Sequence, residues 1–122
     1  MINTQEIKKD IEKILDDKKA EDIVEIDLSR HLERLSDVCI IASGTSSRHM
    51  QSVGDYVYKY LKNLKLAPKI EGDAKSGWIL IDAAGVEVHL FKPDLRKYYD
   101  LESLMIGGGR PANNNLENLP KI

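Results

Sequence analysis

Few residues in this chain have the type and spacing to do chemistry, and the most suggestive lie in one small polar turn. Residues 43–47, with the sequence SGTSS, precede Arg48 and His49. Amides at a helix N-terminus bind anions, so this turn could hold a phosphate, with Arg48 and His49 adding charge. Its spacing matches neither Gly-rich phosphate-binding motif. Two readings stay open: Thr45 or Ser46 caps the next helix, or the turn contacts an anion or a partner.

The acidic side chains bear on a possible nucleotidyl transferase, an enzyme class whose carboxylates hold two metal ions after a Gly-Ser turn. Here Ser43 and Gly44 lead into a predicted helix, and Asp55 and Asp73 stand alone. Two further acids, Asp82 and Glu87, could approach each other across a hairpin, but the chain has no Asp-x-Asp pair. A nucleotidyl transferase-like enzyme is therefore kept as an alternative only.

Residues that bind metals are sparse. Cys39 is the only cysteine, which excludes an intrachain disulfide, and it lies in the apolar run 38–42. We expect it to pack there as a small apolar side chain. The histidines His31, His49 and His89 are scattered, with no second ligand at a helical or strand spacing. The sequence therefore predicts no metal site.

Composition narrows the class of protein. The chain has 122 residues, enough for one domain with its own core. Charged residues make up 31%, the net charge is −2 and the isoelectric point is about 5.9, and no basic block is present. We therefore expect no direct DNA binding and no contact with bare RNA as the main activity, although a local basic patch stays open. No apolar run approaches the ~18 residues of a membrane span, and no targeting segment is evident. We expect a cytoplasmic protein.

Periodicity predicts the elements that must position any site. Apolar residues recur at helical spacing over 4–18 and 46–64. Further elements are strands near 23–28, 38–42, 69–71, 78–82 and 86–91 and a short helix over 93–99. This order predicts an α/β fold with a single mixed β-sheet of about five strands flanked by helices. We assign residues 1–106 to one domain and expect 107–122, rich in Gly, Asn and Pro, to be a flexible tail.

The strand that begins at Trp78 is the best candidate for a partner-binding surface. Alternation places Trp78, Leu80 and Asp82 on one face; in the inverse arrangement its other face is exposed. Trp and Tyr are effective interface anchors, but they also close cores. Of Tyr98 and Tyr99, we expect one to face the core and one to face outward.

Five segments, taken in order along the chain, form a specific set: residues 43–49, 70–72, 77–82, 86–91 and 98–102. This set resembles the ribosomal silencing factor family, also called Iojap-like proteins. The resemblance covers roughly residues 4–105. It implies an α/β domain shaped like a nucleotidyl transferase without the active site of those enzymes.

The resemblance implies a translational repressor and no catalysis, so no cofactor is expected. Such a protein binds a protein on the intersubunit face of the large ribosomal subunit, the one numbered fourteen. It thereby blocks joining of the small subunit during starvation, and the family is also linked to large-subunit assembly. A homodimer off the ribosome is implied as well. An rRNA-binding assembly factor, with contacts through Arg48, His49 and nearby lysines, remains a second alternative.

The resemblance also indicates where the partner binds. It places the partner-facing surface on the strands 78–82 and 86–91 and on residues 98–102. The residues expected to bind the partner are Trp78, Leu80, Asp82, His89, Lys92, Tyr99 and Glu102. An acidic to neutral chain suits a basic ribosomal protein as its partner.

Overall fold

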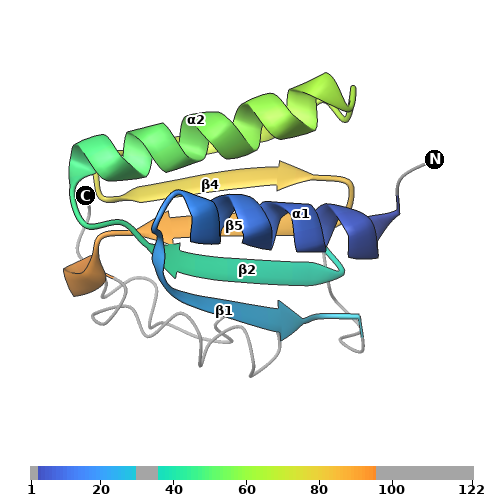
Figure 1. Cartoon of the computed structure of the whole chain (residues 1–122), viewed down its shortest axis with the longest axis horizontal. Coiled ribbons are helices and arrows are strands. Elements are labelled where there is room, and N and C mark those ends of the chain that lie inside the picture. The colour runs from blue at the N-terminus through green and yellow to red at the C-terminus, as the bar shows by residue number, and fades with distance from the viewer. Residues whose placement is uncertain (1–2, 30–35, 96–122) are drawn as a thin grey trace, which may run out of the picture.

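The structure, a computed structural model, describes residues 3–29 and 36–95 and contains two helices and five strands in that part of the chain (Figure 1). Their order matches the predicted order, with bounds that differ by a few residues. The elements are α1 (Thr4–Asp17), β1 (Glu21–Asp27), β2 (Val38–Ser43), α2 (Ser47–Asn63), β3 (Lys69–Asp73), β4 (Trp78–Ala83) and β5 (Val86–Phe91).

The strands form one mixed sheet in the order β1-β2-β5-β4-β3. Strands β2 and β5 are parallel, and the other three pairs are antiparallel. A parallel pair requires a long crossover, which here contains α2, β3 and β4. The predicted α/β fold with a single five-stranded mixed sheet is therefore confirmed.

Both helices pack on the same face of the sheet (Figure 1). α1 begins after Asn3, whose side-chain oxygen accepts a hydrogen bond from the Glu6 amide at 2.9 Å. The apolar stripes of α1 and α2 are buried against the sheet and consist of Ile7, Ile11, Leu15, Met50, Val53, Val57 and Leu61. Opposite them lie residues such as Ile79, Ile81 and Val88 of the central strands.

The other face of the sheet, here called the second face, carries a smaller apolar cluster. It consists of Ile26, Leu28, Cys39, Ile41 and Phe91, with Val24, Trp78 and Leu95 packed against it. Strand β2 contributes to both clusters, and all six of its residues are buried. This burial explains why its sequence reads as a continuous apolar run.

A tight hairpin joins the two strands that carry most of the candidate site. Ala84 and Gly85 both have positive φ, at 52° and 84°, as a type I′ turn requires. The turn fixes the antiparallel register of β4 and β5. After β5, the chain is helical at residues 93–95. The rest of the predicted helix 93–99 and the predicted tail 107–122 lie outside the described residues, which end at 95.

Candidate partner-binding face

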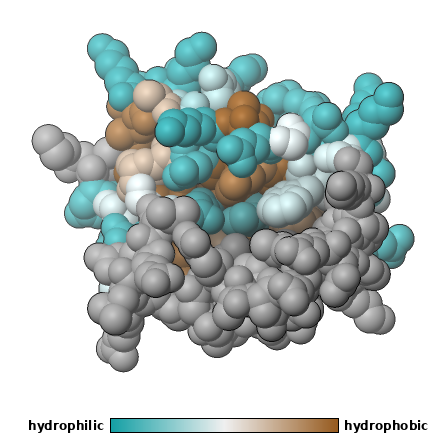
Figure 2. Space-filling view, turned by 180° about the vertical axis from the view of Figure 1, so that it is seen from behind, coloured by the Kyte–Doolittle hydropathy of each residue, from teal (hydrophilic) through white to brown (hydrophobic). Residues whose placement is uncertain are grey.

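The alternation predicted for β4 is present. Ile79, Ile81 and Ala83 are buried under the helices, whereas Trp78, Leu80 and Asp82 are half-buried on the second face. The inverse arrangement is therefore excluded. Seen from behind the helices, apolar side chains gather near the middle of this side of the molecule, with hydrophilic ones around them (Figure 2).

The register of β4 and β5 brings together four of the predicted residues, namely Trp78, Leu80 and Asp82 of β4 and His89 of β5. His89 lies directly opposite Leu80, and Phe91 lies opposite Trp78. Lys92 follows β5 and is half-buried, and its amide donates to the Gly77 carbonyl at 3.0 Å, next to Trp78. Tyr99 and Glu102 lie outside the described residues.

Trp78 is held by aromatic packing. Its ring centroid lies 5.1 Å from that of Phe91, at an interplanar angle of 28°, and 6.0 Å from that of His89. Phe91 is fully buried and His89 is only 3% exposed. Trp78 is thus the outer member of a stack whose inner members are fixed in the sheet. His89, predicted to contact the partner, is too deeply buried to offer it a surface.

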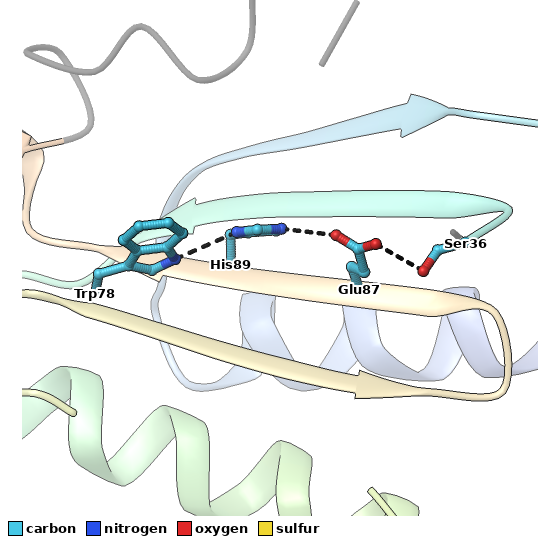
Figure 3. A network of polar contacts seen from close by, with 4 residues as sticks. All are labelled: Ser36, Trp78, Glu87 and His89. Atoms are coloured by element: carbon cyan, nitrogen blue, oxygen red, sulfur yellow. Dashed lines mark hydrogen bonds and ion pairs between the residues drawn. The ribbon is translucent and has the colours of Figure 1, made fainter. Parts of the chain in front are cut away.

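A chain of hydrogen bonds runs along the second face and ends at Trp78 (Figure 3). The Ser36 hydroxyl donates to Glu87 Oε2 at 2.7 Å, and His89 Nε2 lies 3.1 Å from Glu87 Oε1. The Trp78 indole N–H donates to His89 Nδ1 at 3.3 Å. Because an indole only donates, Nδ1 must be the acceptor, and the imidazole proton sits on Nε2, facing the carboxylate.

The carboxylates on the second face are in different environments. Hydrogen bonds from His89 and Ser36 hold the pKa of Glu87 below its usual value. Burial raises the pKa of Asp82, and the charge of Glu87, directly across the ladder, raises it further. Like charges directly opposite each other on paired strands cost stability, so the pair of Asp82 and Glu87 does not stabilise the fold.

Strand β3 extends the charged part of the second face. Its register with β4 places Lys69 opposite Asp82, Glu71 opposite Leu80 and Asp73 opposite Trp78. Every residue of β3 is exposed. Around Leu80 and Trp78, acidic side chains therefore outnumber basic ones on the described part of this face, as a basic partner would require.

Three potential metal ligands meet on the second face, but their arrangement does not suit a metal. The ligand atoms of Cys39, Glu87 and His89 lie within 4.8 Å of one another. Burial, with a contribution from Glu87, raises the pKa of the Cys39 thiol to about 12, so the thiolate is disfavoured. A metal on His89 Nε2 would move the ring proton to Nδ1, against the Trp78 N–H. The cluster is best described as a hydrogen-bonded network.

The polar turn before α2 is a helix cap, as one of the two readings predicted. Ser46 Oγ accepts a hydrogen bond from the His49 amide at 3.0 Å. The His49 ring accepts from the Thr45 amide at 3.0 Å and donates from Nε2 to the Lys18 carbonyl at 2.7 Å. His49 thus ties the end of α1 to the start of α2, and its ring has no nitrogen left for a ligand.

Sequence reasoning missed Ser36 and Phe91, and it considered Glu87 only as a carboxylate across the hairpin from Asp82. The spacing of Glu87, His89 and Phe91 along one strand places all three on the same face, so that part could have been found. The hydrogen bond from Ser36 could not have been found in this way. Ser36 precedes β2 and reaches Glu87 only because β2 pairs in parallel with β5.

In the described part of the chain, neither helix is long and apolar enough to span a membrane.

The profile of a protein family described as "Ribosomal silencing factor during starvation" matches residues 2–121. Ribosomal silencing factor RsfS of Chromobacterium violaceum is 38% identical over 109 residues, spanning 88% of this chain and 88% of that protein. The Mus musculus protein named "Mitochondrial assembly of ribosomal large subunit protein 1" is 35% identical over 95 residues, which are 75% of this chain and 41% of that protein.

Solved structures show the same fold. A crystal structure of a Chromobacterium violaceum protein superposes with a TM-score of 0.79 at 36% identity, covering 91% of this chain and 92% of that one. A crystal structure of a Bacillus halodurans protein gives a TM-score of 0.73 at 32% identity, covering 83% of this chain and 94% of that one.

Proposed function

Because this chain belongs to the ribosomal silencing factor family, we propose that it represses translation by binding a protein on the intersubunit face of the large ribosomal subunit. The names of its relatives support a ribosome-associated role. The observation that carries the finer proposal is Trp78, a half-exposed anchor held in place by His89 and Phe91 on the second face.

The chemistry of the face favours a basic protein partner. Trp78 and Leu80 offer an apolar centre, and Asp82, Glu71 and Asp73 lie around them. Interfaces commonly combine a buried aromatic centre with a polar rim, and complementary charge raises the association rate. Lys92, close to Trp78, would contact an acidic group at the edge of the same partner.

The proposed mechanism is steric. A domain of roughly 100 residues has a radius of gyration of about 13 Å, so it excludes another surface over several nanometres. Bound where the small subunit docks, it would block joining with no bond made or broken. We therefore propose a factor that needs no cofactor and acts in the cytoplasm, where starvation would be the condition in which it matters. Large-subunit assembly, which the mouse relative's name mentions, is compatible with the same binding site.

A sucrose gradient tests this function. The purified chain is mixed with isolated large subunits, small subunits are added, and the fractions are assayed for the protein and for joined ribosomes. We expect the chain to sediment with the large subunit and the joined fraction to fall. If the chain stays at the top of the gradient, or sediments with large subunits without reducing joining, the proposal of silencing by steric block is wrong.

The enzyme alternative has its own test. A nucleotidyl transferase must bind a nucleotide with Mg²⁺, and a ligand present at about 100 times its dissociation constant stabilises the fold by about 2.7 kcal/mol. Thermal unfolding with Mg²⁺ and ATP or CTP should therefore raise the melting temperature of an enzyme. We expect no shift, because Glu87 is already engaged by His89 and Ser36.

A further inference from the structure

The outer surface of α2 carries a groove that the proposed protein partner does not use. It has a volume of about 470 Å³ and is lined by Arg48, Gln51, Ser52, Asp55, Tyr56 and Lys59. The buried stripe of α2 faces the sheet, so these residues point away from it. The groove therefore lies on the opposite side of the molecule from the second face.

Two parallel rows of side chains form the walls of the groove. Arg48, Ser52 and Tyr56 follow one another at a spacing of four, and Gln51, Asp55 and Lys59 do the same. Residues four apart lie above one another on a helix, so each row is a ridge. Arg48 and Lys59 are eleven positions apart, which places them about 16 Å apart along the axis.

The groove is basic in an acidic protein. Arg48 and Lys59 lie along it, and Lys18 reaches it from the end of α1. Among the described residues, no carboxylate pairs with any of these three cations. The one acid of the groove, Asp55, accepts a hydrogen bond from Gln51 Nε2 at 2.9 Å. The groove and Lys18 thus carry three cations against one carboxylate, although the whole chain has a net charge of −2.

An aromatic ring lies between these charges. Tyr56 is 47% exposed, and Lys18 Nζ lies 3.8 Å from its ring centroid. One face of the ring is therefore covered by a cation, and the rest is open to the groove. Basic groups that alternate with an aromatic ring are typical of surfaces that bind single-stranded nucleic acid.

We propose that the α2 groove binds the phosphodiester backbone of single-stranded RNA. Phosphates recur every few ångström along a strand, so Arg48 and Lys59 can each meet one, with Lys18 reaching a third. Tyr56 offers a surface on which a base stacks, and Gln51 and Ser52 can hydrogen-bond to sugar or phosphate oxygens. An acidic peptide would use the cations but would leave the ring without a matching group. This contact is independent of the protein-binding function proposed for the second face.

Nuclear magnetic resonance of the whole chain tests the proposal, with an oligouridylate of about twelve nucleotides as the probe. We expect the amide signals of α2 around residues 48–59 to shift on titration, while those of β4 and β5 stay in place.

The affinity of the chain for the oligouridylate is measured at about 50 mM and about 200 mM salt. The variant Arg48→Gln/Lys59→Gln should bind at least tenfold more weakly. Its salt slope should fall by about 1.4, since each phosphate contact on a single strand contributes about 0.7.

A matched variant controls for net charge. Lys9→Gln/Lys13→Gln removes the same charge from exposed positions on α1 that do not line the groove, and it should bind like the unaltered chain. The proposal is overturned if no signal shifts, if the shifts lie on β4 and β5, or if both double variants bind equally. It is also overturned if an oligoglutamate peptide of equal charge shifts the α2 signals as strongly as the RNA does.

Discussion

The indole N–H of Trp78 donates to Nδ1 of His89, and that single contact joins an exposed anchor to a buried polar network. His89 in turn faces Glu87, which Ser36 also holds. The orientation of Trp78 is therefore set by side chains that are themselves largely buried. A pre-oriented anchor loses less conformational freedom on binding than a mobile one.

Replacing Trp78 by Ala should weaken binding to the large subunit by roughly 30-fold, which corresponds to about 2 kcal/mol for a central aromatic anchor. Trp78 is half-buried, so the fold should persist, and circular dichroism checks this. Binding is measured by co-sedimentation over a range of subunit concentrations. Ile70→Ala is the control, since Ile70 is 48% exposed and its register with Ile81 places it on the other face. Equal losses in both variants would contradict the assignment.

Replacing His89 by Phe should free Trp78 while keeping a flat ring in the stack. The indole loses its acceptor and Glu87 loses a donor, and a polar group left unpaired costs about 1–3 kcal/mol of stability. Trp78 is the only tryptophan, so acrylamide quenching of its fluorescence reports the change directly. We expect more quenching and a lower urea midpoint. Quenching like that of the unaltered chain would show that His89 does not restrain Trp78.

Glu87 should make the fold sensitive to acid. Its pKa in the folded chain is held below the usual value by His89 and Ser36, so its carboxylate stabilises the fold at neutral pH. That contribution is complete above the unfolded pKa and is lost as the pH falls through the folded pKa. Glu87→Gln should lower the urea midpoint at pH 7 and bring it close to that of the unaltered chain near pH 3. An equal deficit at both pH values would contradict this account.

Glu12 should affect the pH dependence of stability in the direction opposite to Glu87, so that its contribution is lost as the pH rises. Burial, and a hydrogen bond shared with Glu25, raise the pKa of Glu12 to about 7. Glu25 itself is paired with Lys8, whose Nζ lies 2.9 Å from its Oε1. A raised carboxyl pKa means that the folded chain holds the proton more tightly than the unfolded chain. The stability contributed by the protonated Glu12 is therefore present at low pH and lost between about pH 4.5 and 7.

Glu12→Gln tests that direction, because an amide keeps the hydrogen bond to Glu25 at every pH. We expect the variant to match the unaltered chain at pH 5 and to melt at a higher temperature at pH 8. Lys13→Gln, one position along α1 and exposed, is the control. It should melt at the same temperature as the unaltered chain at both pH values. A variant that is less stable than the unaltered chain at pH 8 would refute the shared proton.

The helices, the strands and the faces that they bury follow from local sequence patterns. Apolar spacing was sufficient for α1 and α2, since an amphipathic helix buries one stripe wherever it packs. Alternation likewise separated Trp78, Leu80 and Asp82 from Ile79 and Ile81, because side chains of a strand point in opposite directions. The segments that resemble the ribosomal silencing factors were also sufficient to identify the family.

The order of the strands in the sheet, and with it the set of side chains on the second face, depends on contacts between distant segments. The parallel pairing of β2 with β5 brings Ser36 to Glu87, 51 positions away along the chain. Antiparallel pairing of β4 with β5 places His89 beside Trp78 and turns a histidine with no obvious partner into the support of the anchor. Local patterns carry no information on such pairings, because register depends on turns and on packing between segments distant in sequence.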